Sequence, residues 1–110
     1  MKNYLLITGS ILLTLFLVPS YAIERSAKQI QVEKYFHSAE EQTAKDALWT
    51  ATNIFKVAVY DDGSSRNSYA MYVCEVLKEK GFYGVSVQII DVIKLNSDGK
   101  WVKLGGAKCN

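Results

Sequence analysis

The segment Asp61–Ser68 holds the densest group of side chains that could take part in binding chemistry. It follows an apolar run and precedes an amphipathic one, so it is predicted to leave a strand and open a helix. Open α/β sheets commonly bind ligands at such a junction. Gly63 permits close backbone approach, and Ser64 and Ser65 offer hydroxyls. Arg66 and the amides at the helix start would favour an anion.

The same loop also has an ordinary structural explanation. Asp-Asp-Gly is a typical turn sequence, and Ser65 or Asn67 can cap the helix that follows. Asp61 and Asp62 would repel an anion unless they turned away or held a cation, and no phosphate-loop or dinucleotide motif is present. Adjacent residues leaving a strand point apart, which argues against a catalytic carboxylate pair. We expect turn and cap chemistry here, with anion binding as the alternative.

Asp91 is the one carboxylate on a strand face that is otherwise apolar. A buried, unpaired charge is costly, so Asp91 needs a partner or a local bulge that turns it outward. Arg66, Lys103 or a tyrosine hydroxyl could supply that partner. We favour a structural, hydrogen-bonded role for Asp91. It completes a candidate ligand-binding set that otherwise comes from the loop: Asp61, Ser64, Ser65, Arg66 and Asp91.

Nucleophilic, metal and cofactor chemistry have little support in the chain. His37 is the only histidine, and no G-x-S-x-G motif is present to supply an activated serine. Two distant cysteines with one histidine do not make a zinc site. We therefore expect no catalytic residue, no metal and no cofactor, and predict that the protein is not an enzyme.

Residues 1–22 are typical of a cleaved signal peptide. A lysine follows the first methionine, Leu5–Val18 is mostly apolar, and Ser20 and Ala22 are the small residues that a signal peptidase recognises. The apolar run is short and interrupted for a membrane span, which needs about 20 residues, although an uncleaved anchor is the alternative. We predict that residues 23–110 are periplasmic or secreted, and free of the membrane.

Cys74 and Cys109 are the only cysteines. An exported chain meets an oxidising compartment, and an even number of cysteines favours a disulfide. The bridge would close a loop of about 35 residues and contribute on the order of 3–4 kcal/mol in the chain-entropy picture. It would also hold the penultimate residue against the element that carries Cys74. We predict this disulfide.

The expected mature chain is nearly neutral. The whole sequence has 13 basic and 11 acidic residues, and loss of the lysine in the signal peptide reduces the net charge from +2 to +1. That balance gives no general argument for binding nucleic acid or an anionic membrane. Four lysines make the C-terminal end locally basic: Lys94, Lys100, Lys103 and Lys108. We attribute them to solubilising charge on an exposed strand edge rather than to a binding patch.

The first elements that would position these groups are an arm and a helix. Residues 23–37 have the weakest pattern and predict a partly ordered arm whose apolar side chains lie against the body. Ser38 and Glu41 form a capping-box pattern. Alanines spaced by three and four then predict a helix over 39–51, with Trp49 as its large anchor.

A strand and a second helix flank the candidate loop. Alternation over Ile54–Tyr60 predicts a strand. Its core face is formed by alternate residues: Phe55, Val57 and Val59. Amphipathic spacing over 67–80 predicts a helix that Gly81 ends in the left-handed conformation.

The C-terminal part of the sequence predicts a hairpin. Alternation indicates a long strand over 84–95, a hairpin loop at Asn96–Gly99 and a returning strand over 100–104. Pairing Leu95 with Lys100 keeps the faces of both strands consistent. That register gathers three apolar residues on the outer face as a candidate interface: Ile90, Val92 and Trp101. The N-terminal helix, the arm or a second copy of the protein would cover them.

Together the elements predict an α+β fold, a small α/β sandwich, in the order α-β-α-β-β. A helical crossover makes the first two strands parallel, and the hairpin makes the third antiparallel to the second. The result is a three-stranded mixed sheet whose strand order stays open. Residues 38–110 form a single globular domain, with the second helix on one face and the first available for the other.

Function is predicted from the exposed aromatic and apolar residues. Tyrosine is common at interfaces because it is amphipathic, so Tyr69 and Tyr72 join the candidate interface, although tyrosines also simply cover small cores. We predict a small exported, non-enzymatic binding or accessory protein that acts through a protein partner or as a homodimer. The alternative is a small-ligand or anion binder at Asp61–Ser68, extending to weak hydrolytic activity.

Overall fold

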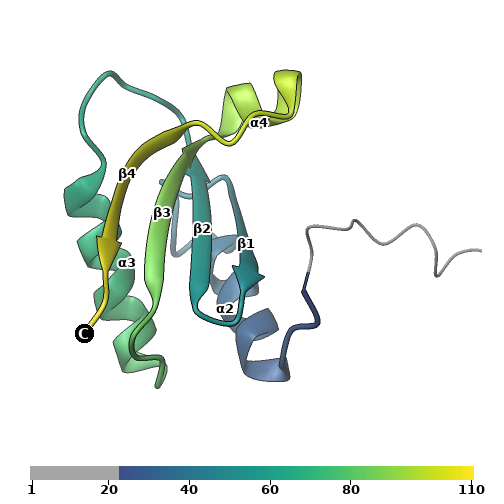
Figure 1. Cartoon of the computed structure of the whole chain (residues 1–110), viewed down its shortest axis with the longest axis vertical. Helices are drawn as coiled ribbons and strands as arrows, with labels where there is room; N and C mark the ends of the chain where they lie inside the picture. Colours follow the sequence, from purple (N-terminus) through teal and green to yellow (C-terminus); the bar gives the residue numbers. More distant parts are fainter. Residues whose placement is uncertain (1–22) are drawn as a thin grey trace, which may run out of the picture.

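A four-stranded mixed sheet with three helices forms the part of the chain that the structure describes. This computed structural model describes residues 23–110, and the predicted signal peptide lies outside them. The elements in chain order are α2 (Ala27–Phe36), β1 (Asp46–Ala51), β2 (Ile54–Val59), α3 (Asn67–Glu79), β3 (Ser86–Asp91), α4 (Val92–Asp98) and β4 (Lys103–Lys108). The strands lie side by side in the order β1-β2-β3-β4 (Figure 1).

The fold has the predicted α+β class, but its sheet has a fourth strand. As predicted, the connection from β2 through α3 joins two parallel strands, and β4 is antiparallel to β3. The additional strand is β1, which forms an antiparallel hairpin with β2. Within residues 23–110, no helix is long and apolar enough to cross a membrane.

Helix α2 occupies the region for which the sequence indicates only a partly ordered arm. Ser26 and Gln29 form a capping box at its start, because each side chain accepts a hydrogen bond from the other residue's amide. Val32 and Phe36 are buried on its inner side. The apolar side chains do lie against the body, but on a regular helix.

The helix predicted over 39–51 is wrong, and the second half of that range is strand β1. The predicted cap residue Ser38 takes part in a turn instead. The Trp49 ring is fully buried, with its centroid 4.8 Å from that of Phe55 and 5.1 Å from that of Phe82. These contacts and the pairing with β2 outweigh the helix propensity of an alanine-rich segment.

The predicted C-terminal hairpin is also wrong, because a helix interrupts it. Strand β3 ends at Asp91, whose carboxylate accepts hydrogen bonds from the amides of Ile93 and Lys94 and caps α4. Gly99 ends α4 in the left-handed conformation, with a φ of 67°, instead of turning a hairpin. The long predicted strand is therefore divided into β3 and α4.

The register of β4 changes as a consequence. Leu95 lies in α4, so the predicted pairing of Leu95 with Lys100 does not form, and Ile89 lies opposite Gly105. Glycine at 105 lets α3 approach the sheet closely. A Cβ at this position would lie 2.4 Å from the backbone carbonyl carbon of Arg66.

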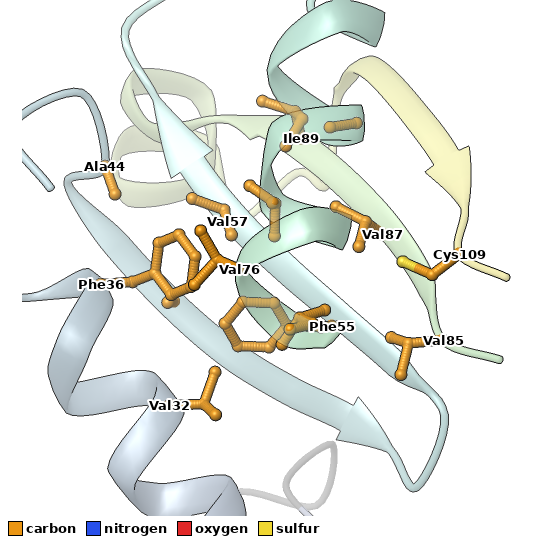
Figure 2. Packing of buried hydrophobic residues seen from close by; sticks show 14 of the residues in the cluster. Val32, Phe36, Ala44, Phe55, Val57, Val76, Val85, Val87, Ile89 and Cys109 are labelled. Atoms are coloured by element: carbon orange, nitrogen blue, oxygen red, sulfur yellow. The ribbon is translucent and has the colours of Figure 1, made fainter. Parts of the chain in front are cut away.

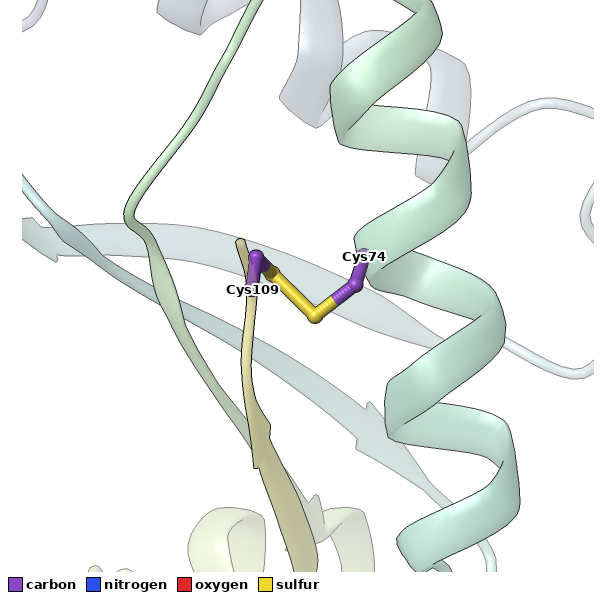
Figure 3. Close-up of a disulfide and its surroundings, with 2 residues drawn as sticks. All are labelled: Cys74 and Cys109. Atoms are coloured by element: carbon purple, nitrogen blue, oxygen red, sulfur yellow. A yellow bond between two sulfur atoms is a disulfide. The ribbon is translucent and has the colours of Figure 1, made fainter.

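The predicted disulfide between Cys74 and Cys109 is present (Figure 3). It joins α3 to the residue that follows β4, with the two Cα atoms 5.2 Å apart. The C-terminus is thereby attached to the helix that covers β3 and β4. A disulfide is compatible with a periplasmic or extracellular protein.

Helices α2 and α3 both pack against one face of the sheet, which we call the core face. Their apolar side chains and those of the strands form one cluster (Figure 2). The predicted core residues of β2 are fully buried: Phe55, Val57 and Val59. Neither helix covers the opposite face, and α4 lies beyond the end of β3 (Figure 1). We call this opposite face the open face; its residues include Leu48, Lys56, Ala58, Gln88, Ile90 and Gly106.

Candidate binding cleft on the open face

The Asp61–Ser68 loop uses many of its polar groups within itself. The Asp61 carboxylate accepts from the Gly63 amide at 2.9 Å. The Asp62 carboxylate accepts from the amide and the hydroxyl of Ser64 at 3.0 and 2.6 Å. These bonds from Ser64 hold the pKa of Asp62 below its usual value. The Ser65 hydroxyl accepts from the first amide of α3 at 3.3 Å. These contacts are turn chemistry. The predicted cap at Ser65 or Asn67 is wrong, because the N-cap position of α3 is Arg66 and its side chain makes no capping hydrogen bond.

Arg66 and Asp91 have separate hydrogen-bonding partners. The Arg66 guanidinium donates to the Tyr60 carbonyl at 2.8 Å and lies 3.5 Å from the Asp62 carboxylate. Asp91 is buried, and its carboxylate accepts from two amides of α4 rather than from Arg66, Lys103 or a tyrosine. The favoured structural role of Asp91 thus takes the form of a helix cap. The five candidate ligand-binding residues divide into a self-bonded loop and this cap.

A cleft of about 340 Å³ lies on the open face, between the strands and α4. Pockets for small ligands typically measure roughly 300–1,000 Å³, so this one is small. Apolar side chains predominate in its lining, with one acidic and one basic residue: Asp46, Ala47, Leu48, Lys56, Ala58, Ile90, Leu95, Asn96, Gly99 and Trp101.

Trp101 and Lys56 belong to this cleft together. The Lys56 ammonium lies 4.4 Å from the centroid of the Trp101 ring, a cation–π contact. Trp101 remains 38% exposed, whereas Ile90 is only 1% exposed. Two of the three apolar interface candidates therefore line one cleft. The third, Val92, is buried at the start of α4 and is not among the lining residues. The chain's own segment 95–101, rather than the N-terminal arm, borders the cleft.

Tyr69 and Tyr72, the other interface candidates, lie on α3 and so on the opposite side of the sheet. Both hydroxyls donate to the carboxylate of Glu41, which is 5% exposed. Burial raises the pKa of Tyr69 above its usual 10.0, and the hydrogen bond to Glu41 does the same for the pKa of Tyr72. This cluster attaches the segment between α2 and β1 to α3.

Side chains of α2 and α3 accept hydrogen bonds from backbone amides on both edge strands of the sheet. On β1, the Glu33 carboxylate accepts from the Trp49 amide at 3.0 Å. On β4, the Asn67 side chain accepts from the Gly106 amide at 3.0 Å. Edge groups that are occupied in this way do not pair readily with a strand from another chain. At these two positions the edges are occupied, whereas neither α2 nor α3 covers the open face (Figure 1).

The roles of three charged residues are not predicted from the sequence, and the capping role predicted for Glu41 is wrong because its carboxylate accepts from Tyr69 and Tyr72. No local pattern indicates the partners of Glu33 and Glu41, because these lie 16 and 28 or more residues along the chain. Lys56 has a local signal, since it interrupts an apolar strand on the face opposite Phe55 and Val57. A lysine at that position indicates a strand face that no helix covers.

Within residues 23–110, no group of three or more His, Cys, Asp or Glu side chains is placed to hold a metal ion. No protein-family model matches the chain, and no curated protein or solved structure is significantly similar to it. What can be inferred about function therefore comes from the geometry of the cleft and the charges around it.

Proposed function

We propose that the protein is a small exported accessory protein that binds a protein partner through the cleft on its open face. The observation that carries the proposal is the one-sided cover of the sheet. Helices α2 and α3 bury the core face, while the open face keeps a cleft with an apolar floor. The occupied edges of β1 and β4 favour binding at the face over strand addition.

The side chains of the cleft suit a protein partner. Trp101 is a large, half-exposed aromatic residue beside the apolar Leu48 and Ile90. Tryptophan at the centre of an apolar surface is enriched among residues that dominate binding energy. The Cys74–Cys109 disulfide is compatible with a location outside the cytoplasm, where such a partner would be met.

Site-specific photo-crosslinking in cells tests the proposal. The full chain is expressed in its source cells with a benzophenone amino acid in place of Leu48. The same probe in place of Met71 is the matched control, because Met71 is 63% exposed on α3, away from the open face. We expect a discrete heavier adduct from position 48 and none from position 71.

Two results would contradict the proposal: no adduct from position 48, or the same adducts from both positions. An adduct of twice the chain's mass would identify the partner as a second copy. Size-exclusion chromatography with light scattering would then have to show a dimer.

A further inference from the structure

The open face carries two ammonium groups that have no carboxylate partner in the described chain. Lys56 lines the cleft, and Lys103 lies across Gly106. A Cβ added at Gly106 would be 2.9 Å from Cε and 3.2 Å from Nζ of Lys103. Within residues 23–110, neither ammonium lies within 4.0 Å of a carboxylate oxygen. Both charges are therefore available to an external anion.

These two charges lie near one line across the sheet. The strand register places Lys56 opposite Gln88, and Gln88 opposite Gly106. Two strand spacings therefore separate the backbone of Lys56 from the glycine that Lys103 crosses, a distance of roughly 10 Å. A short peptide segment can span that distance, because an extended chain advances about 3.3 Å per residue.

The one acidic residue of the cleft, Asp46, is outnumbered by the lysines of the open face, and its carboxylate already has partners within the chain. Asp46 lies 2.8 Å from the His37 imidazole and also accepts from the Ala47 amide at 2.8 Å. A further lysine, Lys108, shares the open face with Ser86 at the end of β4. The open face is therefore predominantly basic around an apolar cleft.

We infer that the cleft binds an apolar side chain from an acidic segment of a partner protein, with neighbouring carboxylates placed against Lys56 and Lys103. The inference rests on the proposed binding at the open face and specifies the chemistry of the partner. Opposite charges at the rim of an apolar site increase specificity and the association rate. Two copies of this chain joined through the same face would bring like charges together, so a different protein is the occupant.

A titration with short probe peptides tests the charge preference. The full chain is exported from a bacterial host, and the exported protein is purified for NMR. Three capped peptides are compared: Glu-Phe-Glu, Gln-Phe-Gln and Lys-Phe-Lys. We expect Glu-Phe-Glu to bind about three- to tenfold more tightly than Gln-Phe-Gln at low salt, and the preference to shrink as salt rises. Chemical shifts should move at Leu48, Ile90 and the Trp101 indole, and not at Met71.

Charge-removing variants locate the preference. Lys103→Gln and Lys56→Gln should each weaken Glu-Phe-Glu binding about threefold and reduce its preference over Gln-Phe-Gln. Lys78→Gln is the matched control, because Lys78 is exposed on α3 away from the open face. Lys103→Gln is the cleaner variant, since Lys56→Gln also removes the cation–π contact with Trp101.

The outcomes separate this inference from the proposed function. Equal binding of the three peptides, or a preference for Lys-Phe-Lys, would overturn the acidic partner but leave the cleft as the binding surface. The acidic partner would also be overturned if no chemical shift in the cleft moved with peptide at about 1 mM, a concentration at which weak binding is detected. Crosslinking from position 48 judges the surface itself in every case.

Discussion

The core face and the open face of the sheet use tryptophan in different ways. Trp49 on the core face is fully buried beneath helices, with Phe55 and Phe82 against its ring. Trp101 on the open face is 38% exposed and has the Lys56 ammonium over its ring. The first arrangement stabilises the fold, and the second leaves apolar surface exposed, where we propose that a partner binds. In so small a domain, which face the helices cover decides between these roles.

The largest expected effect of a single change lies on the core face, at Trp49. Trp49→Ala removes the two ring contacts and the 3.1 Å hydrogen bond from the indole to the Gln29 carbonyl. Truncating a buried tryptophan typically costs about 3–5 kcal/mol, so the free energy of unfolding should fall by that amount. Urea unfolding followed by circular dichroism measures it. Trp49→Phe should lose less stability. A loss below about 1 kcal/mol for Trp49→Ala would mean that Trp49 is not a core residue.

Adjacent glycines of β4 compare the two faces directly. Gly105→Ala would place a Cβ 2.4 Å from the Arg66 backbone, where α3 cannot yield easily. Gly106→Ala would meet the flexible end of Lys103 at 2.9 Å and the Val87 carbonyl oxygen at 3.0 Å. We expect losses of about 2–3 kcal/mol at 105 and about 1 kcal/mol at 106, measured by urea unfolding. Equal losses would mean that α3 does not hold β4 this closely.

The Glu41 cluster tests how firmly the core face holds the segment between its helix and strand. Glu41→Gln weakens the acceptor that the hydroxyls of Tyr69 and Tyr72 share. Hydrogen bonds to a charged group contribute about 1.5–3 kcal/mol, so we expect a loss near the lower end because glutamine can still accept. Thermal unfolding near neutral pH measures it. An unchanged melting temperature would mean that the cluster is only a surface contact.

The same cluster predicts a loss of stability in alkali. The raised pKa of Tyr69 and of Tyr72 means that the folded protein holds these protons more tightly than the unfolded chain. Their contribution is therefore complete below pH 10.0, the usual tyrosine value, and is lost as the pH rises above it. Unfolding free energies measured across this range should decline. The double variant Tyr69→Phe and Tyr72→Phe should flatten the decline, whereas Tyr60→Phe, at an exposed position, should not.

The centre of the fold is predictable from the sequence because its signals are local. Alternation marks β2, amphipathic spacing marks α3, and Gly81 has the positive φ that ends the helix. Strand β1 has no such local signal. Its position depends on contacts of Trp49 with Glu33 and Phe82, which are distant in sequence. A window of neighbouring residues contains neither contact, so alanine spacing alone indicates a helix.

The candidate site is predictable only in part, for a related physical reason. Ile90 and Trp101 do share a cleft, but the register that led to this prediction is wrong. They meet because α4 and Gly99 return the chain to the sheet. The error depends on Asp91. An aspartate within a run of alternating apolar residues can be an unusual strand residue or the cap of a new helix. The hydrogen bonds from the amides of Ile93 and Lys94 make Asp91 a cap. Because Ile93 and Leu95 continue the spacing by two inside α4, the pattern does not show where the strand ends.

The smallest change in stability is expected at Trp101, the tryptophan of the open face, in contrast to the large loss expected at Trp49 on the core face. Trp101→Ala removes the contact with Lys56, and an exposed cation–π pair contributes about 0.5–1 kcal/mol. The free energy of unfolding should therefore fall by clearly less than for Trp49→Ala, while binding of the Glu-Phe-Glu peptide weakens by about tenfold or more. Trp101→Phe should restore much of the binding because it keeps an aromatic ring beside Ile90. If Trp101→Ala instead unfolds the protein as strongly as Trp49→Ala, the open face is a second core, and partner binding must be sought elsewhere on the molecule.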